Sequence, residues 1–148
     1  MSKVISILRR LFLPVIPLLF SGLAGAMPAL ELEVTLDPAT RALRADAKLT
    51  PADRDFSFLL HESLQVTKAS AAGKALPVEQ RAGPAGLKRW HVRQPRAGEQ
   101  LQISYAGQLQ ALDRQRDHRG VLQRMPPMSS PEGSFLPAGS AWYPQPPG

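Results

Sequence analysis

The feature that most constrains this chain is an alternation of apolar and polar residues with a period of two. In residues 30–36, three leucines and a valine alternate with Glu31, Glu33 and Thr35. Such alternation predicts a β-strand with one buried face and one solvated face. Turn sequences separate this run from similar ones, among them Asp-Pro-Ala-Thr at 37–40 and Ala-Ala-Gly-Lys at 71–74. The 15 prolines and 11 glycines fit a chain of short strands joined by many turns.

We therefore expect an all-β fold, an antiparallel β-sandwich of about seven short strands. The first two strands, 30–36 and 43–49, form a hairpin across the Asp-Pro turn. The small inward residues Ala45 and Ala47 favour close packing of this hairpin against a second sheet. The predicted core contains the large alternating residues of the strands: Leu32, Val34, Phe56, Phe58, Leu64, Trp90, Ile103 and Tyr105.

The first 26 residues have the pattern of a secretory signal peptide. Three basic residues precede an apolar run at 11–20, and Ala-Gly-Ala at 24–26 is a small-residue cleavage site. The alternative is an uncleaved anchor, because residues 11–30 are long enough to span a bilayer. We expect an exported protein, periplasmic or secreted, which contacts the membrane only if the signal segment stays uncleaved.

Charge and cysteine usage exclude several classes of function. The chain carries 18 Lys and Arg against 12 Asp and Glu, a net charge of +6, and three of these cations lie in the first ten residues. The net positive charge of the rest of the chain is too small to indicate nucleic-acid binding, and we expect no nucleic-acid partner. Cysteine is absent, which excludes a disulfide scaffold, a cysteine zinc site, a cysteine nucleophile and a lipid-modified cysteine.

The alternating pattern ends near residue 112, so we divide the exported part into a β-sandwich domain at 27–112 and a segment at 113–148. The segment begins with a charged loop and contains seven prolines after residue 125, and we expect it to build no regular structure by itself. It nevertheless contains four large apolar residues, which we predict to form a docking strip along the sandwich edge or against another domain: Phe135, Leu136, Trp142 and Tyr143. Without a neighbouring domain, Trp142 is expected to be exposed.

No catalytic, cofactor-binding or metal-binding residue is predicted in this chain. His61-Glu62 begins like the zinc motif H-E-x-x-H, but Gln65 occupies the position of the second histidine, and residues 58–66 alternate like strands rather than a helix. The three histidines, His61, His91 and His118, have no ligand spacing and are expected at the surface. Trp90 lies on an alternating strand, which favours a core role over a nucleic-acid or sugar platform.

Four stretches, taken in order, resemble the N-terminal β domain of M1-type (gluzincin) zinc aminopeptidases and their bacterial relatives. They are LEVTLDPATRALRADAKL at 32–49, FSFLLHESLQV at 56–66, LQISYAGQL at 101–109 and GSFLPAGSAWYP at 133–144. In that family the zinc ligands and the catalytic acid lie in a following thermolysin-like domain. Neither its H-E-x-x-H motif nor its G-x-M-E-N-like strand occurs in these 148 residues.

The resemblance implies a non-catalytic β domain of an exported M1-like aminopeptidase, whose partner is a catalytic zinc domain or another protein surface. Any zinc would belong to that catalytic domain, and whether the chain is part of an enzyme stays open. The alternative is a stand-alone exported β-sandwich that binds a carbohydrate or a protein, with Trp90, Trp142 and Tyr143 as stacking surfaces.

We predict that export removes the first 26 residues, so that the mature protein begins at Met27. The reason is the small-residue site at 24–26 behind the apolar run. Mass spectrometry of the exported protein measures this directly. Recovery of an intact Met1 in the membrane fraction would instead support the anchor.

Overall fold

A computed structural model describes residues 28–113 and 125–147, and over these residues the protein is built from β-strands. Its largest sheet has five strands in the order β1-β2-β8-β4-β5, each antiparallel to its neighbours. The bounds of these strands are β1 Glu31–Asp37, β2 Ala42–Leu49, β8 Leu101–Gln108, β4 Leu64–Ala71 and β5 Lys74–Ala75.

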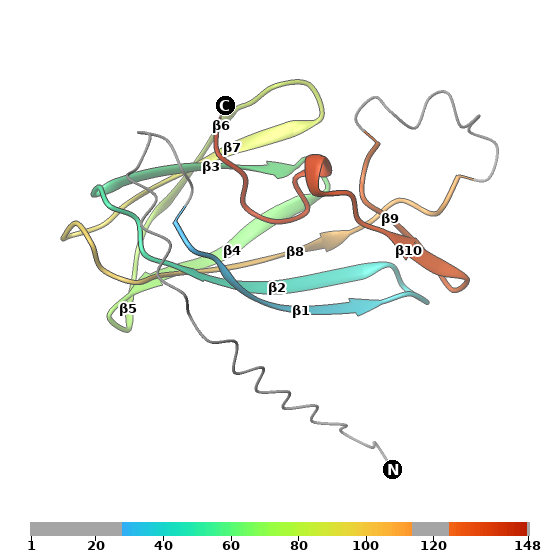
Figure 1. Cartoon of the computed structure of the whole chain (residues 1–148), viewed down its shortest axis with the longest axis horizontal. Helices are drawn as coiled ribbons and strands as arrows, with labels where there is room; N and C mark the ends of the chain where they lie inside the picture. The colour runs from blue at the N-terminus through green and yellow to red at the C-terminus, as the bar shows by residue number, and fades with distance from the viewer. Residues whose placement is uncertain (1–27, 114–124, 148) are drawn as a thin grey trace, which may run out of the picture.

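A second antiparallel sheet has three strands in the order β3-β7-β6 and lies across the first. Its strands are β3 Asp55–His61, β7 Leu87–Arg93 and β6 Val78–Ala82. Figure 1 shows the two sheets as separate layers, with the C-terminal segment crossing the open side between them. The predicted all-β antiparallel sandwich is confirmed, although the described residues contain ten strands rather than about seven.

The hairpin of β1 and β2 shows how the local sequence determines this structure. The two strands pair without interruption from Glu31 opposite Lys48 to Asp37 opposite Ala42. A side-chain oxygen of Asp37 accepts a hydrogen bond from the backbone N–H of Ala39 at 3.0 Å, which stabilises the predicted turn. The inward alanines of β2, at 45 and 47, are at most 3% exposed and allow the second sheet to approach closely.

The core lies between the two sheets. Six of the eight predicted core residues are buried: Phe56, Phe58, Leu64, Trp90, Ile103 and Tyr105. Leu32 is only partly buried, and the prediction for Val34 is wrong because this side chain is 37% exposed. Both belong to β1, the outermost strand of the five-stranded sheet. The three-stranded sheet is narrower and leaves the inner face of β1 incompletely covered.

One glycine is required by the close contact between β8 and the turn that joins β3 to β4. A Cβ atom at Gly107 would lie 2.0 Å from the backbone oxygen of Ser63. Backbone atoms cannot yield like a flexible side chain, so any larger residue at 107 would push this turn away from the sheet.

The proline-rich segment is more regular than its sequence predicts. It contains a short antiparallel pair, β9 (Met128–Ser130) and β10 (Gly133–Phe135), and a single 3-10 turn, η2 (Ala138–Ser140). A bridge between Met128 and Gln110 attaches β9 to the chain that follows β8. The segment was expected to build no regular structure by itself, and these elements form against residues already fixed in the sandwich.

The predicted signal peptide, residues 1–26, lies outside the described residues. Within the described ranges, no helix is both long enough and apolar enough to cross a membrane.

We predict that Phe58→Ala lowers the free energy of unfolding by about 3–5 kcal/mol. The side chain is fully buried and stacks on Phe56 with ring centroids 5.6 Å apart, so its removal leaves a cavity between the sheets. The shift of the urea denaturation midpoint measures this loss.

Phe135→Ala is the matched control, since Phe135 is 38% exposed. It should change the free energy of unfolding by less than about 1 kcal/mol. Equal shifts for the two variants would contradict the assignment of the inner face of β3.

Candidate functional site

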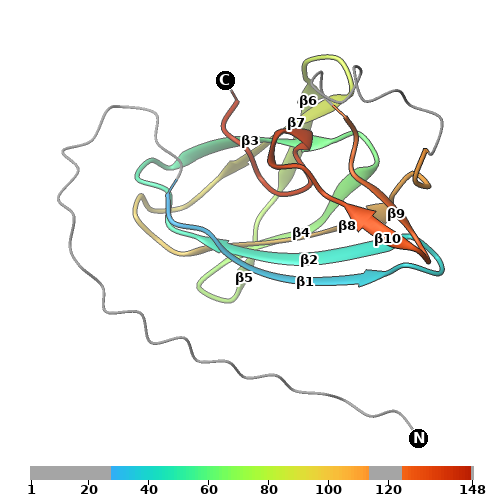
Figure 2. The ribbon, with the colours of Figure 1, turned by 45° about the vertical axis from the view of Figure 1, so that its right-hand side comes forward.

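The C-terminal segment closes the free edge of β3. The backbone N–H of Leu59 donates to the carbonyl of Gln145 at 2.9 Å, and the N–H of Gln145 donates back to the Leu59 carbonyl at 3.1 Å. The N–H of His61 donates to the carbonyl of Ala141 at 2.8 Å. Figure 2 shows this segment running beside β3 and above β1 and β2. The segment therefore pairs with the edge strand β3 at Leu59 and His61.

Two prolines of this segment, Pro144 and Pro146, are placed where they cost no ladder bond with β3. Successive N–H groups of an extended strand point to opposite edges, so Gln145 faces β3 while Pro144 and Pro146 face away. A proline has no N–H to offer, and the outer edge of the segment therefore lacks the donors that another strand would need. The segment completes the sheet and also terminates it.

The core anchors the segment through Trp142. Its carbonyl accepts a hydrogen bond from the Tyr105 hydroxyl at 3.1 Å, and burial raises the pKa of that hydroxyl well above its usual value. The indole packs against the core and meets the Tyr143 ring edge-to-face, with centroids 4.9 Å apart. Trp142 is half-buried, so the expectation that it would be exposed was wrong: the sandwich itself supplies the contact surface.

The structure distributes the four residues of the predicted docking strip between two environments. Leu136 and Trp142 pack against the core, Tyr143 is half-buried, and Phe135 at the end of β10 is 38% exposed. Phe135 is therefore the most exposed of the four, with 38% of its surface open to a partner. The docking role of the four residues stays a prediction.

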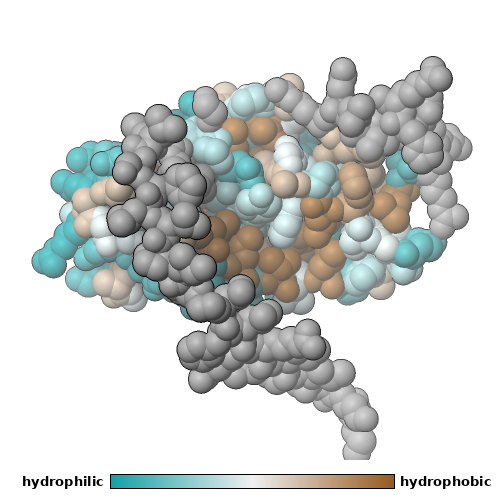
Figure 3. Space-filling view, viewed as in Figure 1, coloured by the Kyte–Doolittle hydropathy of each residue, from teal (hydrophilic) through white to brown (hydrophobic). Residues whose placement is uncertain are grey.

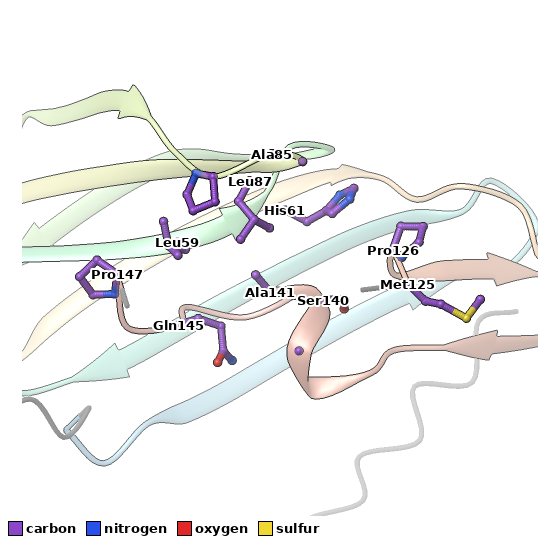
Figure 4. A pocket seen from close by; sticks show the side chains of 13 residues that line it. Leu59, His61, Ala85, Leu87, Met125, Pro126, Ser140, Ala141, Gln145 and Pro147 are labelled. Carbon is purple, nitrogen blue, oxygen red and sulfur yellow. The ribbon is translucent and has the colours of Figure 1, made fainter. Parts of the chain in front are cut away.

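A cavity of about 410 Å³ lies between β3, the loop before β7 and the C-terminal segment. Figure 4 shows Leu59 and His61 on β3, with Leu87 above them and Ala141, Ser140 and Gln145 on the opposite wall. Most of the lining is apolar or proline, and the polar groups are few: His61, Ser140 and Gln145. This arrangement can hold a small apolar group.

His61 is the titratable residue of this cavity, and its side chain is only 7% exposed. Its Nδ1 accepts a hydrogen bond from the backbone N–H of Ser63 at 3.2 Å and lies 2.7 Å from the Ser63 hydroxyl. The neutral ring therefore carries its proton on Nε2. Burial lowers the pKa of His61, and the charge of Glu62 opposes this only partly.

The expectation that the histidines lie at the surface was wrong for His61. A signal was available: Phe58, Leu59 and Leu60 form a continuous apolar run, which indicates a strand covered on both faces. His91 is half-buried, with its Nε2 3.2 Å from a carboxylate oxygen of Asp55, and His118 lies outside the described residues. Trp90 is 6% exposed, and its predicted place in the core is confirmed.

The described residues do not fit a zinc ion. His61 ends β3 and Gln65 lies in β4, so the H-E-x-x sequence spans a turn between strands rather than one face of a helix. The His61 Nδ1 is already occupied by Ser63. In residues 28–113 and 125–147, no three His, Cys, Asp or Glu side chains gather into a group that could hold a metal ion.

The comparisons with known proteins find likeness in structure. No family model matches the chain, and no curated protein matches it. An M1 zinc metallopeptidase from Deinococcus radiodurans, solved as a mutant bound to a Tyr-Ser-Ala substrate, is similar to 77% of this chain with a TM-score of 0.52 and 20% identity. An aminopeptidase N family protein from Idiomarina loihiensis is similar to 69% of it, with a TM-score of 0.46 and 14% identity.

The resemblance to M1-type peptidases that the four motifs predict is confirmed as a likeness of fold. The chain spans 29% of the Deinococcus structure and 17% of the Idiomarina structure, under a third of either.

We predict that the protein loses stability as the pH falls below about 6.5, the usual pKa of an unfolded histidine. Because burial lowers the pKa of His61 in the folded state, the unfolded state binds its proton first. The stabilising contribution is therefore complete above pH 6.5 and decreases as the pH falls toward the lowered pKa. Urea midpoints between pH 7.5 and 5 measure it.

In His61→Gln this part of the pH dependence should disappear. His91→Gln, which changes a histidine on the same face of the same sheet, opposite Ser57 of β3, should retain the part that His61 contributes. An unchanged pH profile in His61→Gln would show that His61 titrates alike in the folded and unfolded chain.

Proposed function

We propose that this chain is the non-catalytic N-terminal β domain of an exported M1-like aminopeptidase, and that it packs against a zinc-bearing catalytic domain outside these 148 residues. The observation that carries the proposal is the likeness of fold to the Deinococcus M1 metallopeptidase over 77% of the chain. The order of the four motifs, from 32–49 to 133–144, supports the same relationship.

The part assigned to this chain is mechanical. The two sheets share a closely packed core. Backbone hydrogen bonds join the segment after β9 to β3, and the Tyr105 hydroxyl donates a hydrogen bond to the carbonyl of Trp142 in the same segment. A domain built in this way can present a rigid surface to a neighbouring domain without taking part in the reaction. The residue best placed for that contact is Phe135, the exposed member of the docking strip.

The proposal leaves the chemistry to the other domain. Gln65 replaces the second histidine of the zinc motif, and His61 is committed to Ser63. An M1-type peptidase activates water on zinc with its motif glutamate, and here Glu62 lies exposed on a turn.

We predict that the purified chain holds no zinc after dialysis and cleaves no aminoacyl chromogenic substrate. In the genomic sequence, the reading frame beyond codon 148 should encode H-E-x-x-H, and the longer polypeptide should hold one zinc ion per chain. Metal analysis and a hydrolysis assay on both proteins measure this. A tightly held zinc in the chain alone would contradict the proposal, and a stop codon after Gly148 would favour the stand-alone binding module.

Phe135→Asp in the longer polypeptide tests the docking contact. The substitution should lower the melting temperature of the catalytic part, because it places a charge in an apolar contact. Val34→Asp is the matched control, since Val34 is 37% exposed and Phe135 38%. Equal effects of the two substitutions would remove Phe135 from the interface.

A further inference from the structure

β1 is an edge strand whose outer backbone is free within the described part of the chain. All seven of its residues pair with β2 on one side. No backbone hydrogen bond joins its other side to residues 28–30, 38–113 or 125–147. The strand contains no proline and no bulge, the two devices that commonly protect an edge. It can therefore accept another strand by main-chain pairing.

The other edges of the two sheets are less suited to this. β5 has two residues, and the C-terminal segment covers β3. β6 is free along one side but offers one large apolar residue, Val78, and carries an ion pair between Arg81 and Glu79 at 2.9 Å. β1 is the longest open edge among the described strands.

The inner face of β1 has apolar surface to cover. Leu32 and Leu36 are partly buried against the core, and Val34 between them is 37% exposed. Figure 3, in the same view as Figure 1, shows apolar surface on the side of the molecule that faces the viewer, where Figure 1 shows β1 and the C-terminal segment. An added strand with apolar residues at alternate positions would cover these three side chains.

The outer face of β1 determines the charge of the partner. Its residues there are Glu31, Glu33, Thr35 and Asp37, all exposed, and the strand contains no cation. Glu31 lies 3.9 Å from Lys48 of β2, whereas Glu33 pairs in register with Asp46, another acid. Within the described residues Glu33 has no cation partner. A lysine or arginine on the added strand would give Glu33 a cation on its free side.

We propose that the β1 edge binds an extended segment of another polypeptide with basic residues at alternate positions and apolar residues between them. A second copy of β1 is a poor occupant, because antiparallel pairing about Val34 sets Glu31 against Asp37. This surface is separate from the docking strip, and the proposal does not rest on the proposed function.

The test uses the purified full chain and a labelled seven-residue peptide, acetyl-Lys-Val-Lys-Val-Arg-Val-Lys-amide. Fluorescence anisotropy at low salt should show saturable binding. Glu33→Lys should weaken it about tenfold, because an attractive cross-strand pair becomes a repulsive one. Asp53→Lys is the matched control, since it makes the same charge change on an exposed loop after β2, and it should leave binding unchanged.

Two N-methylated peptides test whether main-chain pairing occurs. Methyl groups on alternate residues block one edge of a strand. One peptide is methylated at the odd positions and the other at the even positions. One of the two should lose binding, and the other should retain it. Equal binding of both methylated peptides, or equal weakening by Glu33→Lys and Asp53→Lys, would overturn the proposal in favour of diffuse electrostatic attraction. A dimer in sedimentation that dissociates in Val34→Asp would place a second copy at the edge and overturn it as well.

Discussion

Three backbone hydrogen bonds to β3 determine what the C-terminal segment can do. They join Leu59 to Gln145, once in each direction, and the N–H of His61 to the carbonyl of Ala141, and they cover the sheet edge at these two residues of β3. The cavity beside His61 exists only because this segment forms one of its walls. The hydroxyl of Tyr105 then ties the same segment to the centre of the sandwich. Backbone pairing supplies the position, and the core supplies the anchor.

The prolines make this attachment less expensive in entropy. Each proline narrows the conformations open to the unfolded segment, so less freedom is lost when the segment is ordered. Pro144 and Pro146 flank Gln145, which pairs with Leu59, and the positions where their N–H groups would lie face away from β3. A proline-rich segment cannot form a central strand, because prolines lack the N–H groups that a second neighbour needs. The same property suits it to an edge position, where it covers a sheet without offering a new edge to another strand.

The alternation of apolar and polar residues predicted where the strands lie better than it predicted how fully the opposite sheet covers each of them. The β1–β2 hairpin and the burial of Phe58, Ile103 and Tyr105 follow from a period of two and from turn chemistry, both of which are local. The sequence pattern does not say how wide each sheet is. Val34 was assigned to the core because its strand alternates correctly, but the sheet that faces it has three strands against five and leaves the Val34 side chain 37% exposed.

The candidate site was harder to predict for the same reason. His61 occupies a position that alternation assigns to solvent, and a segment 80 residues later in the chain covers it. Trp142 was expected to need a neighbouring domain, but the core that packs around Tyr105 already receives it. In both cases the deciding contact joins residues distant in sequence, and no local pattern encodes such a contact.

The edges of the sandwich differ in how they are protected, and this difference bears on function. One edge is covered by a proline-rich segment, another is only two residues long, and β6 is charged with one large apolar residue. Among the strands that the structure describes, β1 alone combines length, an apolar inner face and free main-chain groups. Its acids disfavour pairing with a second β1, because like charges would meet in register. The same acids favour a basic strand, so one set of side chains both limits self-association and defines the partner.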